Sequence, residues 1–256
     1  MILHIPHASR EIPAGLREQI VLSDEELASE LMEMTDSFTD KLFTCRGATR
    51  IEFPISRLIV DPERFLDDEE EPMSQVGMGV IYTRTSAGGR LRDDLTAGER
   101  KWLIKCYYKP HHERLRRAVD VELATRDRAL IVDCHSFPRH PSLCDRDQSA
   151  DRPDFCVGTD PFHTPDSLRQ TATEAIRRQG FRVEENRPYA GTLVPAAYYR
   201  TDRKVWSIMI EVCRDLYMDE KSGRMNENFF RVHLAVEDLL RDLSHASASG
   251  PGRGGS

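Results

Sequence analysis

Three strand-like apolar runs each lead to a residue that can bind a metal or move a proton. The runs cover residues 1–5, 129–132 and 205–210, and they lead to His7, His135 and Glu211. If the runs are strands of one sheet, two imidazoles and a carboxylate can converge on one side of it. Imidazoles are common zinc ligands, and a carboxylate can transfer protons, so the pattern fits a zinc hydrolase.

The composition is that of a globular α/β protein. The chain has 256 residues, of which 39% are hydrophobic, and its mean hydropathy is -0.53. This is enough for a full core, and no apolar stretch approaches the roughly 20 residues of a membrane helix. We recognise no signal peptide, so we expect a cytoplasmic protein without a membrane partner.

Charge and cysteine content argue against further classes of protein. The net charge of -7 argues against nucleic-acid binding. The six cysteines include no CxxC pair, which favours reduced thiols over a disulfide framework or a structural zinc knot.

Strand-like and helix-like segments alternate along the chain, which predicts a three-layer α/β fold with a mixed, mostly parallel sheet and helices on both faces. We expect an extended segment at 51–60, interrupted by Pro54, and a strand at 181–183. We expect helices at 24–32, 96–125 with Pro110 between two stretches, 166–179, and after Asn226. One domain is predicted over 1–246, followed by a disordered Ser/Gly/Pro-rich tail at 247–256.

Seven motifs, taken in order, resemble those of the N-formylglutamate amidohydrolases. They lie at residues 6–9 (PHAS), 35–36 with 39–43, 56–64, 107–112, 132–136, 188–191 and 210–220. The resemblance covers residues 4–220. It implies a zinc-exopeptidase-like fold, similar to that of the carboxypeptidase and aspartoacylase group, and a role in amino-acid catabolism such as histidine degradation.

The resemblance implies one Zn²⁺ per chain, with His7, Asp36 and His135 as ligands. A catalytic zinc site has three protein ligands and keeps a fourth position for water. Glu11 lies four residues after His7 and competes with Asp36 for the place of third ligand. Asp133 is expected to orient one of the metal ligands without contacting the metal itself.

The expected catalytic residues are Glu211 and Arg57. Glu211 ends a buried-looking strand, and desolvation would raise its pKa into the range useful for a general base. The resemblance implies that Arg57 contacts the scissile carbonyl oxygen or a second carboxylate of the substrate.

Arginines suit a substrate with carboxylates, because a guanidinium can hold a carboxylate through two parallel hydrogen bonds. The resemblance assigns Arg64 to a substrate carboxylate, with Arg214 as a further candidate. It also brings Tyr189 and Gly191 to the substrate, since the glycine allows close approach of the backbone.

The chain departs from the family pattern at two positions. Glu63 and Cys213 stand where the family usually has asparagine. A carboxylate at Glu63 would disfavour a doubly acidic substrate and favour an acyl amino acid of lower or positive charge.

Two other sites are less favoured. Cys134 and His135 are adjacent on a strand and point to opposite faces, so they cannot act as nucleophile and base. The segment 77–80 (GMGV) lacks the third glycine and the preceding strand of a phosphate-binding loop.

The sequence therefore predicts a zinc-dependent amidohydrolase of N-acyl amino acids, with N-formyl-L-glutamate as the leading substrate. Another acyl amino acid or a small peptide-like amide is the alternative substrate. A non-catalytic binding protein on a hydrolase scaffold is the alternative class.

Overall fold

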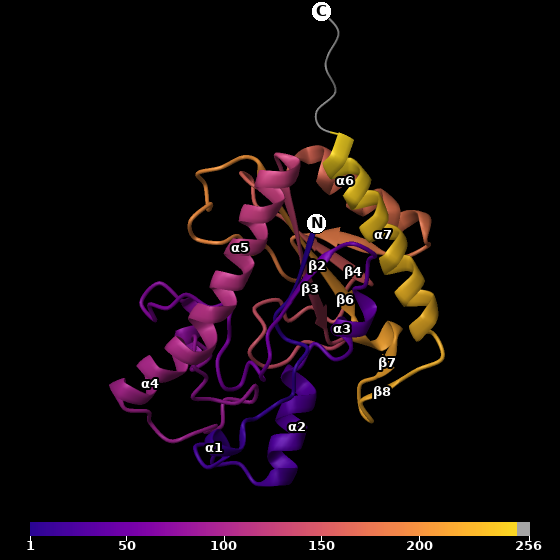
Figure 1. Ribbon diagram of the computed structural model, residues 1–256. Coiled ribbons are helices and arrows are strands. Elements are labelled where there is room, and N and C mark those ends of the chain that lie inside the picture. The colour runs from indigo at the N-terminus through magenta and orange to yellow at the C-terminus, as the bar shows by residue number, and fades with distance from the viewer. Residues whose placement is uncertain (250–256) are drawn as a thin grey trace, which may run out of the picture.

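The structure is a computed structural model that describes residues 1–249. Figure 1 shows one central sheet between helices on both faces. In spatial order the strands are β2 (Thr49–Glu52), β1 (Ile2–Ile5), β3 (Ala129–Phe137), β6 (Val205–Cys213), β4 (Phe155–Gly158) and β5 (Val183–Glu185). Within this sheet, the β4–β6 pair is antiparallel and the other four pairs are parallel. The predicted three-layer, mostly parallel architecture is confirmed.

The two faces of the sheet are covered by different helices. α5 (Lys109–Arg126) packs on one face, whereas α6 (Asp166–Arg178) and α7 (Phe229–Ser249) pack on the other. The remaining helices are α1 (Ala14–Arg17), α2 (Asp24–Met34), α3 (Thr39–Leu42) and α4 (Ala97–Leu103), with the short turns η1 (Pro72–Val76), η2 (Ile104–Tyr108) and η3 (Arg214–Leu216). A small hairpin joins β7 (Met218–Asp219) to β8 (Arg224–Met225).

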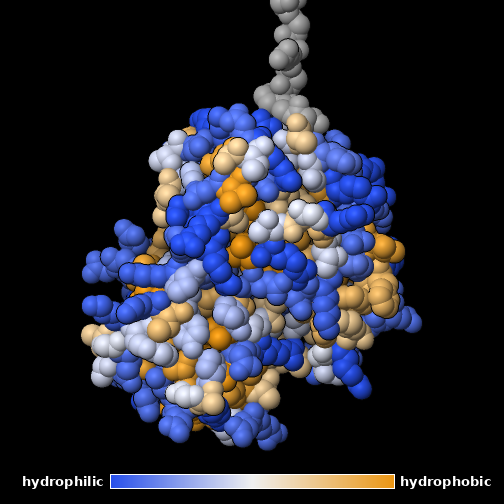
Figure 2. Space-filling model, in the orientation of Figure 1, coloured by the Kyte–Doolittle hydropathy of each residue, from blue (hydrophilic) through white to orange (hydrophobic). Residues whose placement is uncertain are grey.

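Helices of membrane-spanning length and apolarity are absent from residues 1–249. The surface in Figure 2 is mostly hydrophilic, with hydrophobic residues in scattered patches.

The side chains of β3 alternate between two environments. Val132 and Cys134 lie in the core with α6 and α7, while Ile131 packs against α5. Because successive strand side chains point to opposite faces, Asp133 and His135 share the α5 face with Ile131. The face toward α5 therefore changes from apolar to polar along the strand.

The same change occurs on both neighbours of β3. Ile2 of β1 and Val205 of β6 pack on the α5 face, and His4 and Glu211 follow them at even spacing. Polar side chains from three strands thus gather at their carboxyl ends, and the predicted convergence of strand ends is confirmed. Cys134 lies on the opposite face from His135, as predicted.

A second hydrophobic cluster supports the segment between β2 and α4. It contains residues from α1, α2 and the loops at 53–91, such as Leu16, Leu27, Leu58 and Tyr82. This cluster fixes the segment 56–64, which carries the predicted arginines.

Helix predictions agree well with the structure. Ser23 caps α2 through a capping box with Glu26, which satisfies free amides of the first turn. Pro110 lies in the first turn of α5, directly after the π-helical turn η2. A wider turn is compatible with a proline that has no amide hydrogen to donate to the preceding turn.

Three predicted boundaries were wrong. The extended segment 51–60 ends at Glu52, because Pro54 cannot continue the ladder and Ser56 forms a turn with Leu58. The strand expected at 181–183 starts only at Val183. The tail was predicted to begin at residue 247, but α7 continues to Ser249; residues 250–256 lie outside the described part of the chain.

Gly158 of β4 lets two backbone segments touch. A Cβ at this position would collide with the carbonyl oxygen of Gly191 and with the side chain of Met209. We expect Gly158→Ala to lower the free energy of unfolding by about 1–3 kcal/mol, measured by urea denaturation. Gly15→Ala is the matched control, since no atom lies within 4 Å of its added Cβ. Equal stability of Gly158→Ala and wild type would contradict the close contact.

Candidate active site

A cavity of about 630 Å³ lies at the polar ends of β1, β3 and β6. All of the site residues expected from the sequence line it: His7, Asp36, Arg57, Arg64, His135, Tyr189, Gly191, Glu211 and Arg214. Glu11 does not line this cavity, and its side chain is exposed. The structure therefore brings Asp36, not Glu11, to the two histidines.

His7 follows β1 and is almost completely buried, with 2% of its surface exposed. Its Nε2 lies 2.9 Å from Oδ1 of Asp61. Its Nδ1 has no hydrogen bond within the described chain and lies 3.7 Å from Oδ2 of Asp36 and 3.8 Å from Oε2 of Glu63. One nitrogen of His7 is thus fixed by a carboxylate while the other faces two more.

His135 has a similar environment on β3. Its Nδ1 lies 3.0 Å from Oδ2 of Asp36, and its Nε2 lies 3.2 Å from both Glu63 and Asp133. Burial opposes a charge on the ring, but Glu63 and Asp133 outweigh that effect and hold the pKa of His135 well above its usual value. The surroundings of His135 therefore favour a positive charge.

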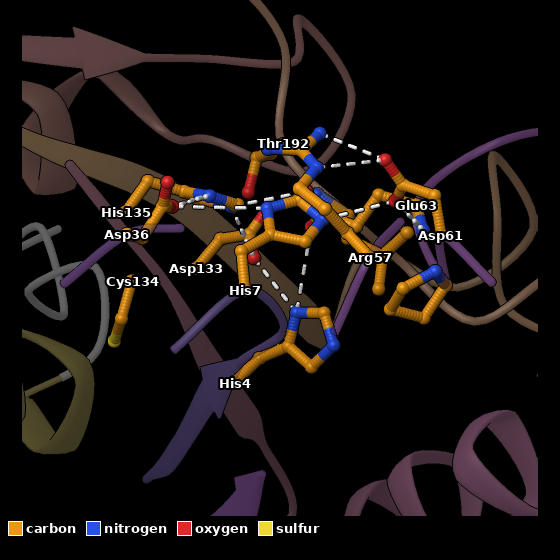
Figure 3. Close-up of polar contacts among 12 residues, drawn as sticks. His4, His7, Asp36, Arg57, Asp61, Glu63, Asp133, Cys134, His135 and Thr192 are labelled. Carbon is orange, nitrogen blue, oxygen red and sulfur yellow. Dashed lines mark hydrogen bonds and ion pairs between the residues drawn. The ribbon is translucent and has the colours of Figure 1, made fainter. Parts of the chain in front are cut away.

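Asp36 is placed by the end of α2. Its backbone N–H donates to the carbonyl oxygen of His7 at 3.0 Å, and its Oδ2 accepts from the backbone N–H of Ser136 at 3.3 Å. Burial works against ionisation of Asp36, yet the neighbouring His135 and His7 lower its pKa. Figure 3 shows Asp36 beside His135, with Cys134 pointing away from this cluster.

Asp61 is a buried acceptor for several donors at once. Its Oδ2 accepts from Nη2 of Arg57 and from the hydroxyl of Tyr82, each at 2.7 Å, while Oδ1 accepts from the backbone of Glu63 at 2.9 Å. Burial would raise the pKa of Asp61, but Arg57 and His7 hold it well below its usual range. Asp61 thus links Arg57, His7 and the turn that carries Glu63.

Glu211 lies directly opposite His135 in the β3–β6 register. Its side chain is buried, and its Oε2 has no hydrogen-bond partner among the described residues. Burial raises the pKa of Glu211 to about 8, with Asp36 and Glu63 adding to the effect. A carboxyl group in this environment can exchange a proton near neutral pH.

The other predicted binding residues surround this centre. Nη1 of Arg214 donates to the carbonyl oxygen of Glu33 at 2.7 Å, and Nη2 lies 3.9 Å from Oδ1 of Asp36. Arg64 donates through Nε to the carbonyl oxygen of Met78 at 3.3 Å. The hydroxyl of Tyr189 donates to Asp145 at 2.9 Å.

Sequence reasoning missed how closely Glu63 approaches the histidines. The ligand atoms of His7, Glu63 and His135 all lie within 4.8 Å of one another. Glu63 was expected only near the substrate, whereas its carboxylate reaches the centre itself. Its position two residues after Asp61 in the 56–64 motif was the available signal.

The donor set fits a divalent cation. Imidazole and carboxylate are the ligands that zinc takes at catalytic sites. Nδ1 of His7, Nε2 of His135 and Oε1 of Glu63 are buried and have no hydrogen-bond partner among the described residues. Buried carboxylates around two imidazoles need a compensating positive charge, which a metal ion or added protons can supply.

Comparison with known proteins identifies the family. The sequence model described as N-formylglutamate amidohydrolase matches residues 1–218. The chain belongs to the N-formylglutamate amidohydrolase family. It is therefore a hydrolase, which removes the alternative of a non-catalytic binding protein.

Individual members of the family agree with this assignment. The chain is 25% identical to an N-formylglutamate deformylase of Pseudomonas putida, a match that covers 86% of this chain and 82% of that protein. It is also similar to the crystal structure of N-formylglutamate amidohydrolase from Ralstonia eutropha JMP134. That match has a TM-score of 0.84 and 25% identity, and it covers 96% of this chain and 93% of the other.

A protein of Agrobacterium tumefaciens shares the fold of this amidohydrolase at lower similarity. The TM-score is 0.63 at 19% identity, over 96% of this chain and 90% of that chain.

The contacts of Asp61 predict a large effect of its removal. In Asp61→Ala the Arg57 guanidinium stays buried without its carboxylate, which should lower the free energy of unfolding by about 3–5 kcal/mol in urea denaturation. Asp93→Ala removes an exposed partner of Arg90 and should change stability by about 0.5 kcal/mol or less. Similar losses in both variants would argue against a buried anchor at Asp61.

Proposed function

We propose that this protein is a zinc-dependent amidohydrolase of N-acyl amino acids, with N-formyl-L-glutamate as the leading substrate and formate and L-glutamate as products. One observation carries the proposal: Oδ2 of Asp36 faces Nδ1 of both His7 and His135, at 3.7 and 3.0 Å. The family and its relatives support the substrate.

His7, Asp36 and His135 would hold one Zn²⁺ per chain. Each histidine has a carboxylate near its Nε2, namely Asp61 for His7 and Asp133 for His135. Such partners orient metal-binding imidazoles in many zinc proteins. A bound zinc ion would supply a Lewis acid that polarises the amide carbonyl and helps a water molecule to lose a proton, so that its oxygen can attack the carbonyl carbon.

Glu211 would move the protons of the reaction. Its carboxylate would accept a proton from the attacking water and then donate it to the leaving amine nitrogen. This role needs a pKa near neutrality and a free oxygen toward the cavity. The raised pKa and the unpaired Oε2 support it.

The arginines would hold the acidic end of the substrate. Arg64 is proposed for a substrate carboxylate, and Arg57 for the scissile carbonyl oxygen or a second carboxylate. Arg214, Tyr189 and Gly191 line the same cavity and would complete the binding site. Asp61 keeps the Arg57 guanidinium in place through Nε and Nη2, at 3.1 and 2.7 Å.

A different acyl amino acid is the second candidate substrate. Glu63 lines the cavity together with Glu33 and Glu71, so the cavity wall carries several negative charges. Like charges disfavour a doubly acidic ligand. This lining favours a substrate with one carboxylate, or one with a positive charge.

The first experiment measures zinc content and formate release from N-formyl-L-glutamate. We expect one zinc per chain, and Glu211→Gln should lower kcat about 100- to 10,000-fold without loss of zinc. In wild type, kcat/KM should fall on acidification, because protonated Glu211 cannot act as a base. The pH at which kcat/KM falls to half should lie between the ordinary glutamate pKa of 4.5 and about 8.

The exposed Glu174→Gln is the matched control and should behave as wild type. Zinc without turnover would move the search to other acyl amino acids. Absence of zinc would overturn the proposed mechanism.

Glu63→Asn tests the charge preference. Removing one carboxylate should lower KM for N-formyl-L-glutamate about tenfold, which corresponds to about 1.4 kcal/mol. The KM for N-formyl-L-leucine, which has a single carboxylate, should change much less. Parallel changes for both substrates, in steady-state assays at equal zinc content, would show that Glu63 does not select by charge.

A further inference from the structure

Part of the cavity lining is apolar, in contrast to the charged centre. Met34, Phe65, Pro72 and Met73 belong to this lining, and we call them the apolar wall. Phe65 is 60% exposed, and Met34 and Met73 are half-buried. The reaction proposed above uses none of these side chains.

The apolar wall is held in place by contacts that need no ligand. The buried Glu71 joins two parts of it, because its Oε2 accepts from the backbone N–H of Phe65 at 3.0 Å and its Oε1 from that of Met73 at 2.9 Å. Met34 and Met73 also pack against the hydrophobic cluster that supports the segment between β2 and α4. The wall is therefore formed before a substrate binds, which lowers the entropic cost of binding.

Phe65 directly follows Arg64, the residue proposed for a substrate carboxylate. The carbonyl oxygen of Arg64 accepts from the hydroxyl of Tyr108 at 3.0 Å, and its Nε donates to the carbonyl oxygen of Met78 at 3.3 Å. These contacts fix the residue but use only Nε of the guanidinium, which leaves Nη1 and Nη2 for a ligand. A carboxylate bound there would lie beside the apolar wall.

The structure of an N-acyl amino acid decides which of its groups meets this wall. The α-carboxylate and the side chain are attached to the same carbon atom, whereas the acyl group lies across the scissile amide. With the carboxylate at Arg64 and the amide at the histidines, the side chain lies next to the residues that flank Arg64. The apolar wall is therefore placed for the amino-acid side chain and not for the acyl group.

Charge and hydrophobicity favour the same kind of side chain. Glu33, Glu63 and Glu71 line the cavity, and they would repel a carboxylate on the substrate side chain. An aliphatic side chain would instead cover the exposed ring of Phe65 and remove apolar surface from water. Methionine side chains are flexible and can adapt to aliphatic groups of different shapes.

We infer that the enzyme accepts N-formyl amino acids with an aliphatic side chain, such as leucine, and that the apolar wall is the subsite for this side chain. The inference rests on the proposed function and narrows its second candidate substrate to apolar amino acids. It makes Phe65, which lies just outside the 56–64 motif, a specificity-determining residue.

The test compares kcat/KM for N-formyl-L-leucine and N-formyl-L-alanine. The two substrates have the same charge and the same scissile bond, so their ratio reports the side-chain subsite alone. Wild type should prefer the leucine substrate about 10- to 100-fold, as expected for burial of three additional carbon atoms. A ratio near one would overturn the inference.

Two variants assign this preference to the apolar wall. Phe65→Ser removes the exposed ring and should lower the leucine-to-alanine ratio about tenfold. Met73→Gln keeps the length of the side chain but makes its end polar, and it should lower the ratio as well. A wild-type ratio in both variants would show that the side chain binds elsewhere.

Val76→Ser is the matched control. Val76 is also apolar and 49% exposed, and it ends the same short turn η1 that carries Met73, but it does not line the cavity. Its ratio should equal that of wild type. A fall as large as in Phe65→Ser would overturn the assignment to the cavity wall.

Equilibrium binding separates the subsite from the proposed reaction. Glu211→Gln should bind both substrates without hydrolysing them, and calorimetry should give a dissociation constant about 10- to 100-fold lower for the leucine compound. Adding Phe65→Ser to this variant should reduce that difference about tenfold.

Each combination of results then has one meaning. The binding preference without hydrolysis by wild type would support the subsite and overturn the proposed reaction. Hydrolysis without the preference, or hydrolysis of N-formyl-L-glutamate alone, would support the reaction and overturn the subsite. Neither binding nor hydrolysis of any of these compounds would overturn both.

Discussion

The concentration of buried carboxylates around two imidazoles is the constraint on which the site depends. Asp36, Asp61, Glu63 and Asp133 approach His7 and His135, and all of these residues except Glu63 are almost completely buried. Buried like charges repel strongly and are stable only when cations or hydrogen bonds compensate them. Arg57 and backbone amides compensate part of this negative charge. The negative charge that is left uncompensated defines a place for a cation.

This requirement explains why distant segments meet here. The strands provide His4, Asp133, His135 and Glu211 on a common face, but they cannot supply the charges that balance them. The segment between β2 and α4, supported by its own hydrophobic cluster, brings Arg57 and Asp61 to the sheet edge. The candidate site therefore lies between the strand ends and the segment that this second cluster supports.

Local sequence patterns were sufficient for the architecture, whereas Asp36, Arg57 and Arg64 were proposed from the motifs that resemble the family. Apolar runs at strand spacing identified β1, β3 and β6, and the polar residue at each strand end was placed correctly in the cavity. The role of Glu63 was beyond such reasoning, because its approach to His135 depends on a turn set by Asp61 and on the packing of a long loop. The contacts of His4 with His111 and Asp133 join β1, β3 and α5, and contacts of this kind leave no periodic pattern in one sequence.

The alternation of side chains along β3 separates the chemistry from the main hydrophobic core by the thickness of one sheet. The core residues that contact α6 and α7 share no side chain with the cavity face. Packing on that side can therefore change by natural drift or by redesign while the positions of Asp133 and His135 stay fixed by backbone pairing. Substitutions on the α6–α7 face of the sheet can therefore change stability, and substitutions on the cavity face can change catalysis, with little effect of one on the other.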